Sequence, residues 1–187
     1  LVFGDPEMKA YKIGYQTNYY NQRNGLSIGF GGSMQDETDL FTSSYSYGFD
    51  VLFNCENWNV DTDWLWMYRE DDRFVGANVN TESYAGHIRG SYNMVLNNGK
   101  ILEPGFMWMR FEGPSSPDKQ THASTLGSFS GSNDTYNIGF NYYLNTHRYK
   151  IIAHYVIQNG SRGRNQFNSQ SALGVPIERS NYFVIGV

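Results

Sequence analysis

Four histidines are the residues of this sequence best suited to acid–base chemistry: His87, His122, His147 and His154. Asp61 and Asp63 stand two residues apart. On a strand, that spacing puts both carboxyl groups on one side, where they could form an acid pair. A histidine beside a serine or an aspartate could instead activate a nucleophile for hydrolysis. One interpretation of the sequence is therefore a membrane hydrolase that uses one of these histidines.

The motifs that organise such chemistry are missing from the sequence. It contains no H-E-x-x-H, no phosphate-binding Walker loop and no G-x-S-x-G. Cys55 is the only cysteine, which excludes a disulfide within the chain and makes a cysteine-based metal site an unlikely design. We therefore predict that the protein is not an enzyme and carries no cofactor and no metal.

The composition argues against a nucleic-acid-binding protein and against a protein with membrane-spanning helices. The chain has 187 residues, a formal net charge of -4 and 17% aromatic residues, with 15 tyrosines. Its pI is about 5.5 and its mean hydropathy is -0.55. An acidic chain of this kind is not expected to bind nucleic acid. No run of about 18 apolar residues is present, so the sequence predicts no transmembrane helix.

Apolar and polar residues alternate along most of the chain, which is the period of a β-strand. The pattern predicts an all-β, antiparallel fold, and we find no convincing helical period. Nine strands are expected, at residues 9–20, 25–34, 45–55, 58–69, 84–96, 100–111, 135–144, 149–158 and 181–187.

The connections between these strands alternate in length. Short ones fall at 21–24, 56–58, 96–100 and 145–148, and long ones at 35–44, 70–83, 112–134 and 159–180. Short turns at one rim and long loops at the other are typical of a transmembrane β-barrel of the outer membrane. A soluble barrel or sandwich is the alternative fold. We expect one barrel domain over residues 1–187. Because bacterial barrels have an even number of strands, nine predicts the C-terminal part of a larger one.

In a barrel, the polar side of each strand would line the pore, and aromatic residues on the other side would meet the lipid headgroups. The predicted pore-lining residues are Lys12, Asp50, Asp61, Asp63, Arg69, His87, Arg89, Glu103, Lys150 and His154. The predicted loop-mouth residues are Lys119, Arg162 and Arg164. The predicted lipid-facing aromatic belts contain Tyr19, Trp58, Trp64, Trp66, Tyr68, Trp108, Tyr142 and Tyr149.

Two features of this pattern leave alternatives open. Arg110 falls on the outward side near the long loops, where its side chain could reach the interface or bind a lipopolysaccharide phosphate. The serine-rich segment 114–134 could fold inward as a constriction or stay outside the barrel.

Four segments resemble the phosphate-selective porins of the O and P type. They are "YGFDVLFNCENWNVDTDWLWMYRE" (47–70), "KILEPGFMWMRFE" (100–112), "YNIGFNYYLNTHRYKIIAHYVIQN" (136–159) and "NYFVIGV" (181–187). The resemblance implies a sixteen-stranded barrel, commonly a homotrimer, that conducts small anions, with Asp50 and Asp63 facing the lumen. The family's selectivity depends on lumen arginines and lysines. Here Met107 stands where a lumen arginine is expected, and the assigned inward charges balance.

We therefore expect an outer-membrane porin of a Gram-negative bacterium, through which small hydrophilic solutes or anions diffuse passively. Its expected partners are the lipid bilayer, lipopolysaccharide, and either further copies of itself or other outer-membrane proteins. The alternative function is a structural or docking barrel with a plugged lumen. A barrel enzyme is the third.

Overall fold

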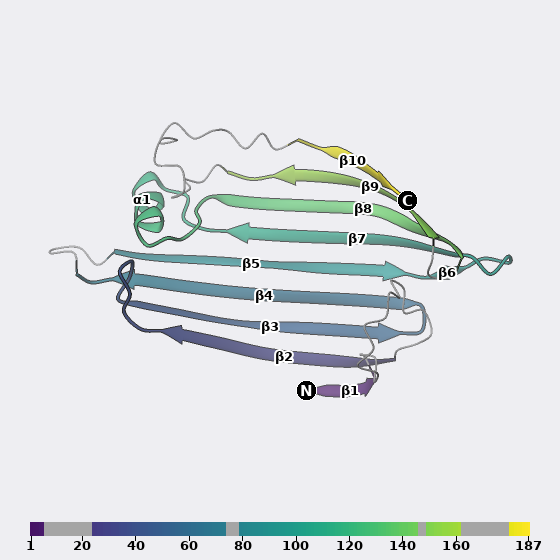
Figure 1. Ribbon diagram of the computed structural model, residues 1–187, viewed down its shortest axis with the longest axis horizontal. Helices are drawn as coiled ribbons and strands as arrows, with labels where there is room; N and C mark the ends of the chain where they lie inside the picture. The colour runs from purple at the N-terminus through teal and green to yellow at the C-terminus, as the bar shows by residue number, and fades with distance from the viewer. Residues whose placement is uncertain (6–23, 74–78, 146–148, 162–179) are drawn as a thin grey trace.

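The computed structural model describes residues 1–5, 24–73, 79–145, 149–161 and 180–187. These residues form one antiparallel sheet and a single helix (Figure 1). The elements are β1 (Val2–Asp5), β2 (Asn24–Gln35), β3 (Ser43–Cys55), β4 (Trp58–Asp71), β5 (Val79–Tyr92), β6 (Met94–Val95), β7 (Ile101–Glu112), α1 (Pro117–Thr125), β8 (Ser132–Asn145), β9 (Tyr149–Asn159) and β10 (Tyr182–Gly186). No helix in the described part of the chain is long and apolar enough to span a membrane.

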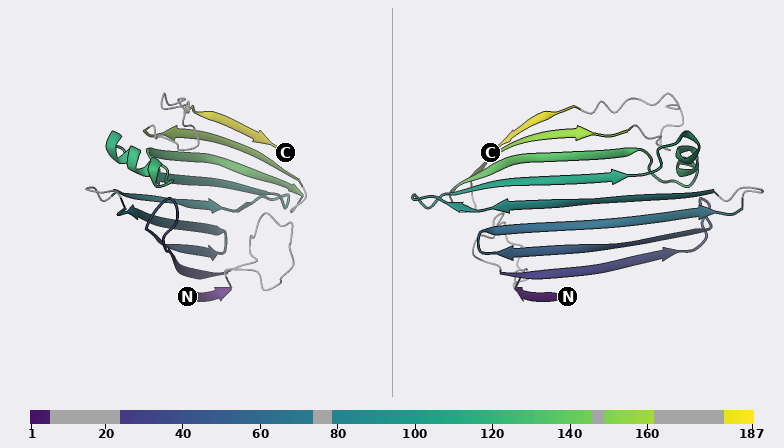
Figure 2. Two further views of the ribbon diagram at one scale, coloured as in Figure 1. Left: turned by 60° about the vertical axis from the view of Figure 1, so that its left-hand side comes forward. Right: turned by 180° about the vertical axis from the view of Figure 1, so that it is seen from behind.

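The strands follow one another across the sheet in chain order, with β1 and β10 at its two edges and β6 paired to the start of β7. The sheet is therefore open, and its closure into a barrel is not seen. The connections from β7 to β8 and from β9 to β10 lie at one end of the strands, here called the long-connection end (Figures 1 and 2). The connections from β3 to β4 and from β8 to β9 lie at the other, the short-connection end, where residues 6–23 also join β1 to β2. The predicted all-β antiparallel fold is thus confirmed.

Every predicted strand that falls within the described residues is present, with small shifts at its ends. The strand expected at 84–96 begins earlier, at Val79, and is divided at Asn93 into β5 and β6. Asn93 is fully buried, and its backbone N–H and side-chain amide donate to the carbonyl oxygen of Asn57. These two hydrogen bonds take Asn93 out of the strand pairing and separate β5 from β6. The strand expected at 9–20 lies outside the described residues.

The structure adds two elements that we did not predict. β1 pairs with the first residues of β2, joining Val2 to Ser27 and Asp5 to Asn24. Helix α1 follows Ser116, has proline at its start, and is followed by Gly127 with φ +63°. Proline at the first helical position and glycine after the last are ordinary helix boundaries. The local signal for α1 was therefore present, although its hydrophobic periodicity is weak.

The sheet is a single layer with almost no core. The buried apolar cluster consists of Phe41, Val79 and Leu126, at the end of the sheet that carries the long connections. Ordinary soluble domains bury each sheet against a second layer. Here one side of the sheet has no such cover in the described part of the chain, although its residues are large and apolar: Phe30 is 81% exposed, Phe183 60% and Ile138 52%.

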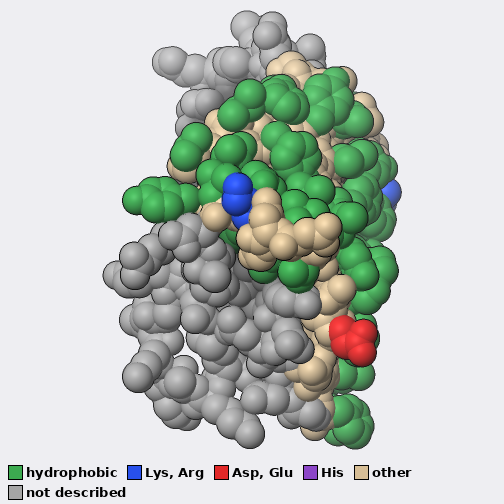
Figure 3. Space-filling view, turned by 90° about the vertical axis from the view of Figure 1, so that its right-hand side faces the viewer, with side chains coloured by type: hydrophobic (Ala, Val, Ile, Leu, Met, Phe, Trp, Pro, Cys, Tyr) green, Lys and Arg blue, Asp and Glu red, His purple; other side chains and the backbone are tan. Residues whose placement is uncertain are grey.

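The strand register separates two faces. We call one the apolar face; it carries Leu26, Ile28, Phe30, Phe49, Trp64, Trp66, Ile88, Phe106, Trp108, Ile138, Phe140, Tyr155 and Phe183. The opposite side, the polar face, carries Asn54, Asn59, Asp61, Asp63, His87, Arg89, Ser91, Glu103, Asn137, Asn141 and His154, together with Leu52, Leu65 and Met107. Viewed from the short-connection end, hydrophobic side chains gather in a band along one flank of the sheet (Figure 3).

Candidate functional site

The polar face brings most of the predicted pore-lining residues together. Antiparallel register places Asp50, Asp61, Asp63, Arg69, His87, Arg89, Glu103, Lys150 and His154 on this one side. Lys12, Arg162 and Arg164 lie outside the described residues, and so does Tyr19. Lys119 lies on α1, at the long-connection end. That these side chains line a pore stays a prediction.

His87 is held between two carboxylates. Its Nε2 lies 2.8 Å from Asp61 Oδ1, and its Nδ1 lies 2.6 Å from Asp63 Oδ1. A neutral imidazole has one N–H, so both contacts can be hydrogen bonds only when the ring is an imidazolium. Arg89 Nη2 also lies 2.7 Å from Asp61 Oδ2. This arrangement neutralises charge, and no serine, threonine or cysteine side chain bonds to the His87 ring among the described residues.

Asp50 belongs to the same row of the sheet, directly opposite Asp63 on the neighbouring strand. Its carboxylate lies over Gly29, where a Cβ would stand 2.1 Å from Asp50 Oδ2. Two carboxylates facing one another destabilise a sheet. Asp63 also contacts Nδ1 of the His87 ring at 2.6 Å, so this carboxylate has a side-chain partner on the strand beyond.

Glu103 is the second charged centre of the polar face. Its Oε1 accepts a hydrogen bond from Ser91 Oγ at 2.8 Å. Its Oε2 accepts from Asn141 Nδ2 at 3.0 Å and from Tyr143 Oη at 2.7 Å. Both oxygens of the Glu103 carboxylate therefore accept hydrogen bonds from side chains of β5 and β8, the two strands that flank β7.

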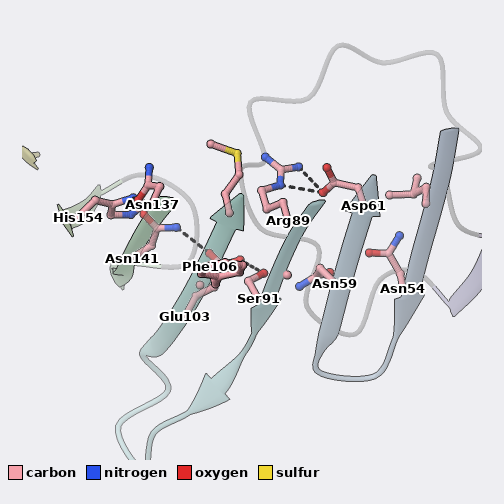
Figure 4. A pocket seen from close by; sticks show the side chains of 14 residues that line it. Asn54, Asn59, Asp61, Arg89, Ser91, Glu103, Phe106, Asn137, Asn141 and His154 are labelled. Carbon is pink, nitrogen blue, oxygen red and sulfur yellow. Dashed lines mark hydrogen bonds and ion pairs between the residues drawn. The ribbon is translucent and has the colours of Figure 1, made fainter. Parts of the chain in front are cut away.

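A hollow of about 390 Å³ lies between these two centres. Polar side chains of the five strands β3, β4, β5, β7 and β8 line it, with His154 of β9 at one end (Figure 4). His154 Nδ1 lies 2.9 Å from Asn137 Oδ1. Its Nε2 is buried and has no hydrogen-bond partner among the described residues. Sequence reasoning chose His154 and Glu103 as pore-lining residues but did not single out the asparagines, because amides leave no motif.

The described residues contain no group of three or more histidine, cysteine, aspartate or glutamate side chains that could hold a metal ion. His122 lies on α1, away from the hollow's lining, and His147 lies outside the described residues. The cluster of Asp61, Asp63 and His87 offers an acid–base group without a nucleophile beside it.

Segment 113–131 folds against the polar-face end of the sheet. Arg69 Nη1 donates to the carbonyl oxygens of Leu126 at 3.0 Å and Gly127 at 2.9 Å. The Arg69 guanidinium also stacks over the Phe41 ring at 4.9 Å. Arg69 therefore holds the end of α1 rather than pointing freely from the strand, a role that sequence reasoning did not anticipate.

A second clamp ties the neighbouring long connections together. Arg73 donates to the carboxylate of Asp71 at 2.9 Å and to the carbonyl oxygen of Thr38 at 2.9 Å. The hydrogen bond to Asp71 raises the pKa of the Arg73 guanidinium. Arg69 and Arg73 thus both contact residues 37–42 at the long-connection end.

Several of the predicted aromatic residues contact other aromatic rings on the apolar face. Tyr68 stacks on Tyr45 with ring centroids 4.8 Å apart, Trp66 on Tyr47 at 5.6 Å, and Trp64 meets the edge of Trp108 at 5.7 Å. Trp64 lies in the middle of β4, opposite Phe49.

The comparisons with known proteins leave the family open. No protein-family model, curated protein or solved structure matches the chain. The resemblance to phosphate-selective porins therefore stays a prediction, and the function has to be argued from the two faces of the sheet.

Arg110 lies on the apolar face, as predicted, but it is not a free cation. It forms an ion pair with Glu112, donates to Tyr84 Oη at 2.9 Å, and lies 3.6 Å from Asp134 Oδ1. Glu70 and Glu82 share this side and this end of the sheet. The charges of the apolar face thus gather at the rim, where a polar headgroup layer would begin.

Proposed function

We propose that this sheet is part of the wall of an outer-membrane β-barrel that lets small hydrophilic solutes diffuse across the outer membrane of a Gram-negative bacterium. One observation carries the proposal: a single-layer sheet exposes a wide apolar face on one side and a charged, amide-rich face on the other. A lipid bilayer would stabilise the apolar face through its hydrocarbon, and water in the lumen would stabilise the polar face. The strands β2 to β5 and β7 to β9 have 11 to 14 residues, enough for the 9–11 or so that cross a bilayer.

Inside a bilayer the two sheet edges would need partner strands, since unpaired backbone amides are costly in hydrocarbon. β1 and β10 form those edges. The proposed wall is therefore completed by additional strands, and the porin resemblance suggests about sixteen in all. The bilayer and lipopolysaccharide are its proposed partners, with the rim around Arg110 nearest the headgroups.

The pattern of ion pairs favours an open pore over a plugged one. Asp61 pairs with His87 and Arg89 on the adjacent strand, and Glu103 bonds to side chains on its two neighbouring strands. These contacts run along the wall. A plug would instead require partners that cross the lumen.

Planar-bilayer recording tests the pore. We expect the purified full-length protein, reconstituted from detergent, to give steady stepwise conductance. A salt gradient should give a reversal potential near zero, because the four acidic and four basic residues that the sequence assigns to the pore balance. A heat-modifiable, folded protein that never conducts would contradict the pore and favour the docking barrel.

Tryptophan fluorescence tests which face meets lipid. All four tryptophans of the chain, at positions 58, 64, 66 and 108, lie on the apolar face. We expect bilayers of bromine-labelled lipid to quench most of their emission, because bromine quenches only at contact, while aqueous acrylamide should quench little. The reverse pattern would mean that the apolar face is covered by protein. Matched vesicles without bromine are the control.

A further inference from the structure

We propose that the hollow on the polar face binds a neutral, polyhydroxylated solute, that is, a small sugar. This inference rests on the proposed pore and names the class of solute that it would favour. It follows from three properties of the hollow: its shape, its charge and its unused hydrogen-bonding groups.

Two neighbouring rows of side chains shape the hollow. One row runs Leu52, Asp61, Arg89, Met107 and Asn137 across five strands. The next row runs Asn54, Asn59, Ser91, Gly105, Gly139 and His154. Gly105, which lines the hollow, leaves the second row without a side chain at that point, which deepens the depression. Its volume of about 390 Å³ falls within the range of roughly 300–1,000 Å³ of small-molecule sites.

The charges in the hollow are already matched. Arg89 is its cation, and both Nε and Nη2 of that side chain contact Asp61 Oδ2 at 2.7 Å. Glu103 adds a carboxylate whose two oxygens are both hydrogen-bonded. An anion such as phosphate would meet a neutralised arginine and a second carboxylate, so the site disfavours it. A neutral solute avoids that cost.

Several polar groups remain available among the described residues. The Asn59 side chain makes no hydrogen bond there, and Asn137 uses its Oδ1 toward His154 but not its Nδ2. His154 Nε2 also has no partner among the described residues, but it is enclosed, so a solute does not reach it. Sugar hydroxyls both donate and accept, so they match the free amide groups of Asn59 and Asn137.

The hollow also contains apolar side chains that can contact the C–H groups of a sugar. Leu52 and Met107 lie in the first row beside Asp61 and Asn137. A sugar ring presents C–H groups between its hydroxyls, and these pack against an aliphatic or thioether side chain. Met107, which takes the place of an expected lumen arginine, therefore becomes part of the reason for preferring a neutral ligand.

The test is saturable block of the ion current by maltose, with sodium phosphate at the same concentration as the comparison. We expect maltose to reduce the conductance to a plateau and phosphate to have no such effect. Replacing Asn137 with alanine removes one hydrogen bond and should raise the half-blocking maltose concentration roughly fivefold. Asn59→Ala should act in the same direction. Asn97→Ala, the same change in the exposed turn at the short-connection end, should leave it unchanged.

The outcomes separate this inference from the pore itself. Conductance that phosphate blocks and maltose does not, or equal maltose block in Asn137→Ala and Asn97→Ala, would overturn the sugar site and leave the pore standing. If the folded protein does not conduct, calorimetric titration of the detergent-solubilised protein with maltose decides. Binding that Asn137→Ala weakens would then support the site without the pore, and absence of binding would overturn both.

Discussion

Replacing Gly86 with alanine will destabilise the folded sheet, whereas the same replacement at Gly90 on the same strand will not. A Cβ at Gly86 would stand 2.4 Å from the carbonyl oxygen of Asp63 and 2.4 Å from Cδ2 of Trp64. A Cβ at Gly90 would meet nothing within 4 Å. Both glycines lie on the apolar face of β5. Replacing glycine with alanine therefore changes the intrinsic strand propensity by the same amount in the two variants.

The expected loss at Gly86 is about 1–3 kcal/mol, as for other over-packed positions. The backbone oxygen cannot move without disturbing the ladder between β4 and β5, so the Trp64 ring alone cannot relieve the clash. Urea unfolding in detergent micelles, followed by tryptophan emission, measures the difference between Gly86→Ala and Gly90→Ala. Equal midpoints would show that β4 and β5 are not paired in this register.

The sequence predicted the strands well because alternation is a local property. The period of two placed β3 and β4 within two residues of their observed ends, and it assigned Asp61, Asp63, His87 and Glu103 to one face. Nothing local predicts which residue lies opposite which. The clamp of His87 between two aspartates depends on the β4–β5 register, which the sequence does not state.

The sequence was least informative where side chains act on the backbone. Arg69 was assigned to the pore because it continues the alternation of β4, but it bonds to carbonyl oxygens more than fifty residues away in sequence. Asn93 interrupts a predicted strand through a bond to Asn57. The hollow is lined by residues of six strands, with Gly105 among them. Each of these features is a contact between distant segments, and a single sequence carries no signal for it.

Removing the charge of Arg89 will make the pore select cations. The Arg89 side chain is 61% exposed and pairs with Asp61, whose side chain is 20% exposed. Without the guanidinium, Asp61 keeps only His87 as a partner, and Asp50, Asp63 and Glu103 add further negative charge to the same face. One unit charge about 7 Å from a passing univalent ion changes that ion's local concentration roughly threefold in water.

Removing this positive charge raises the local concentration of the cation and lowers that of the anion. The cation-to-anion permeability ratio of Arg89→Ala should therefore rise up to about sevenfold at low salt, and less as salt screens the charge. Reversal potentials across a salt gradient measure this ratio. Arg110→Ala is the matched control, because it removes the same charge from the apolar face. If both variants shift the ratio equally, the two faces do not separate lumen from lipid. A shift in Arg89→Ala alone ties the polar face to the path of the ions, because only there does the deleted charge lie next to them.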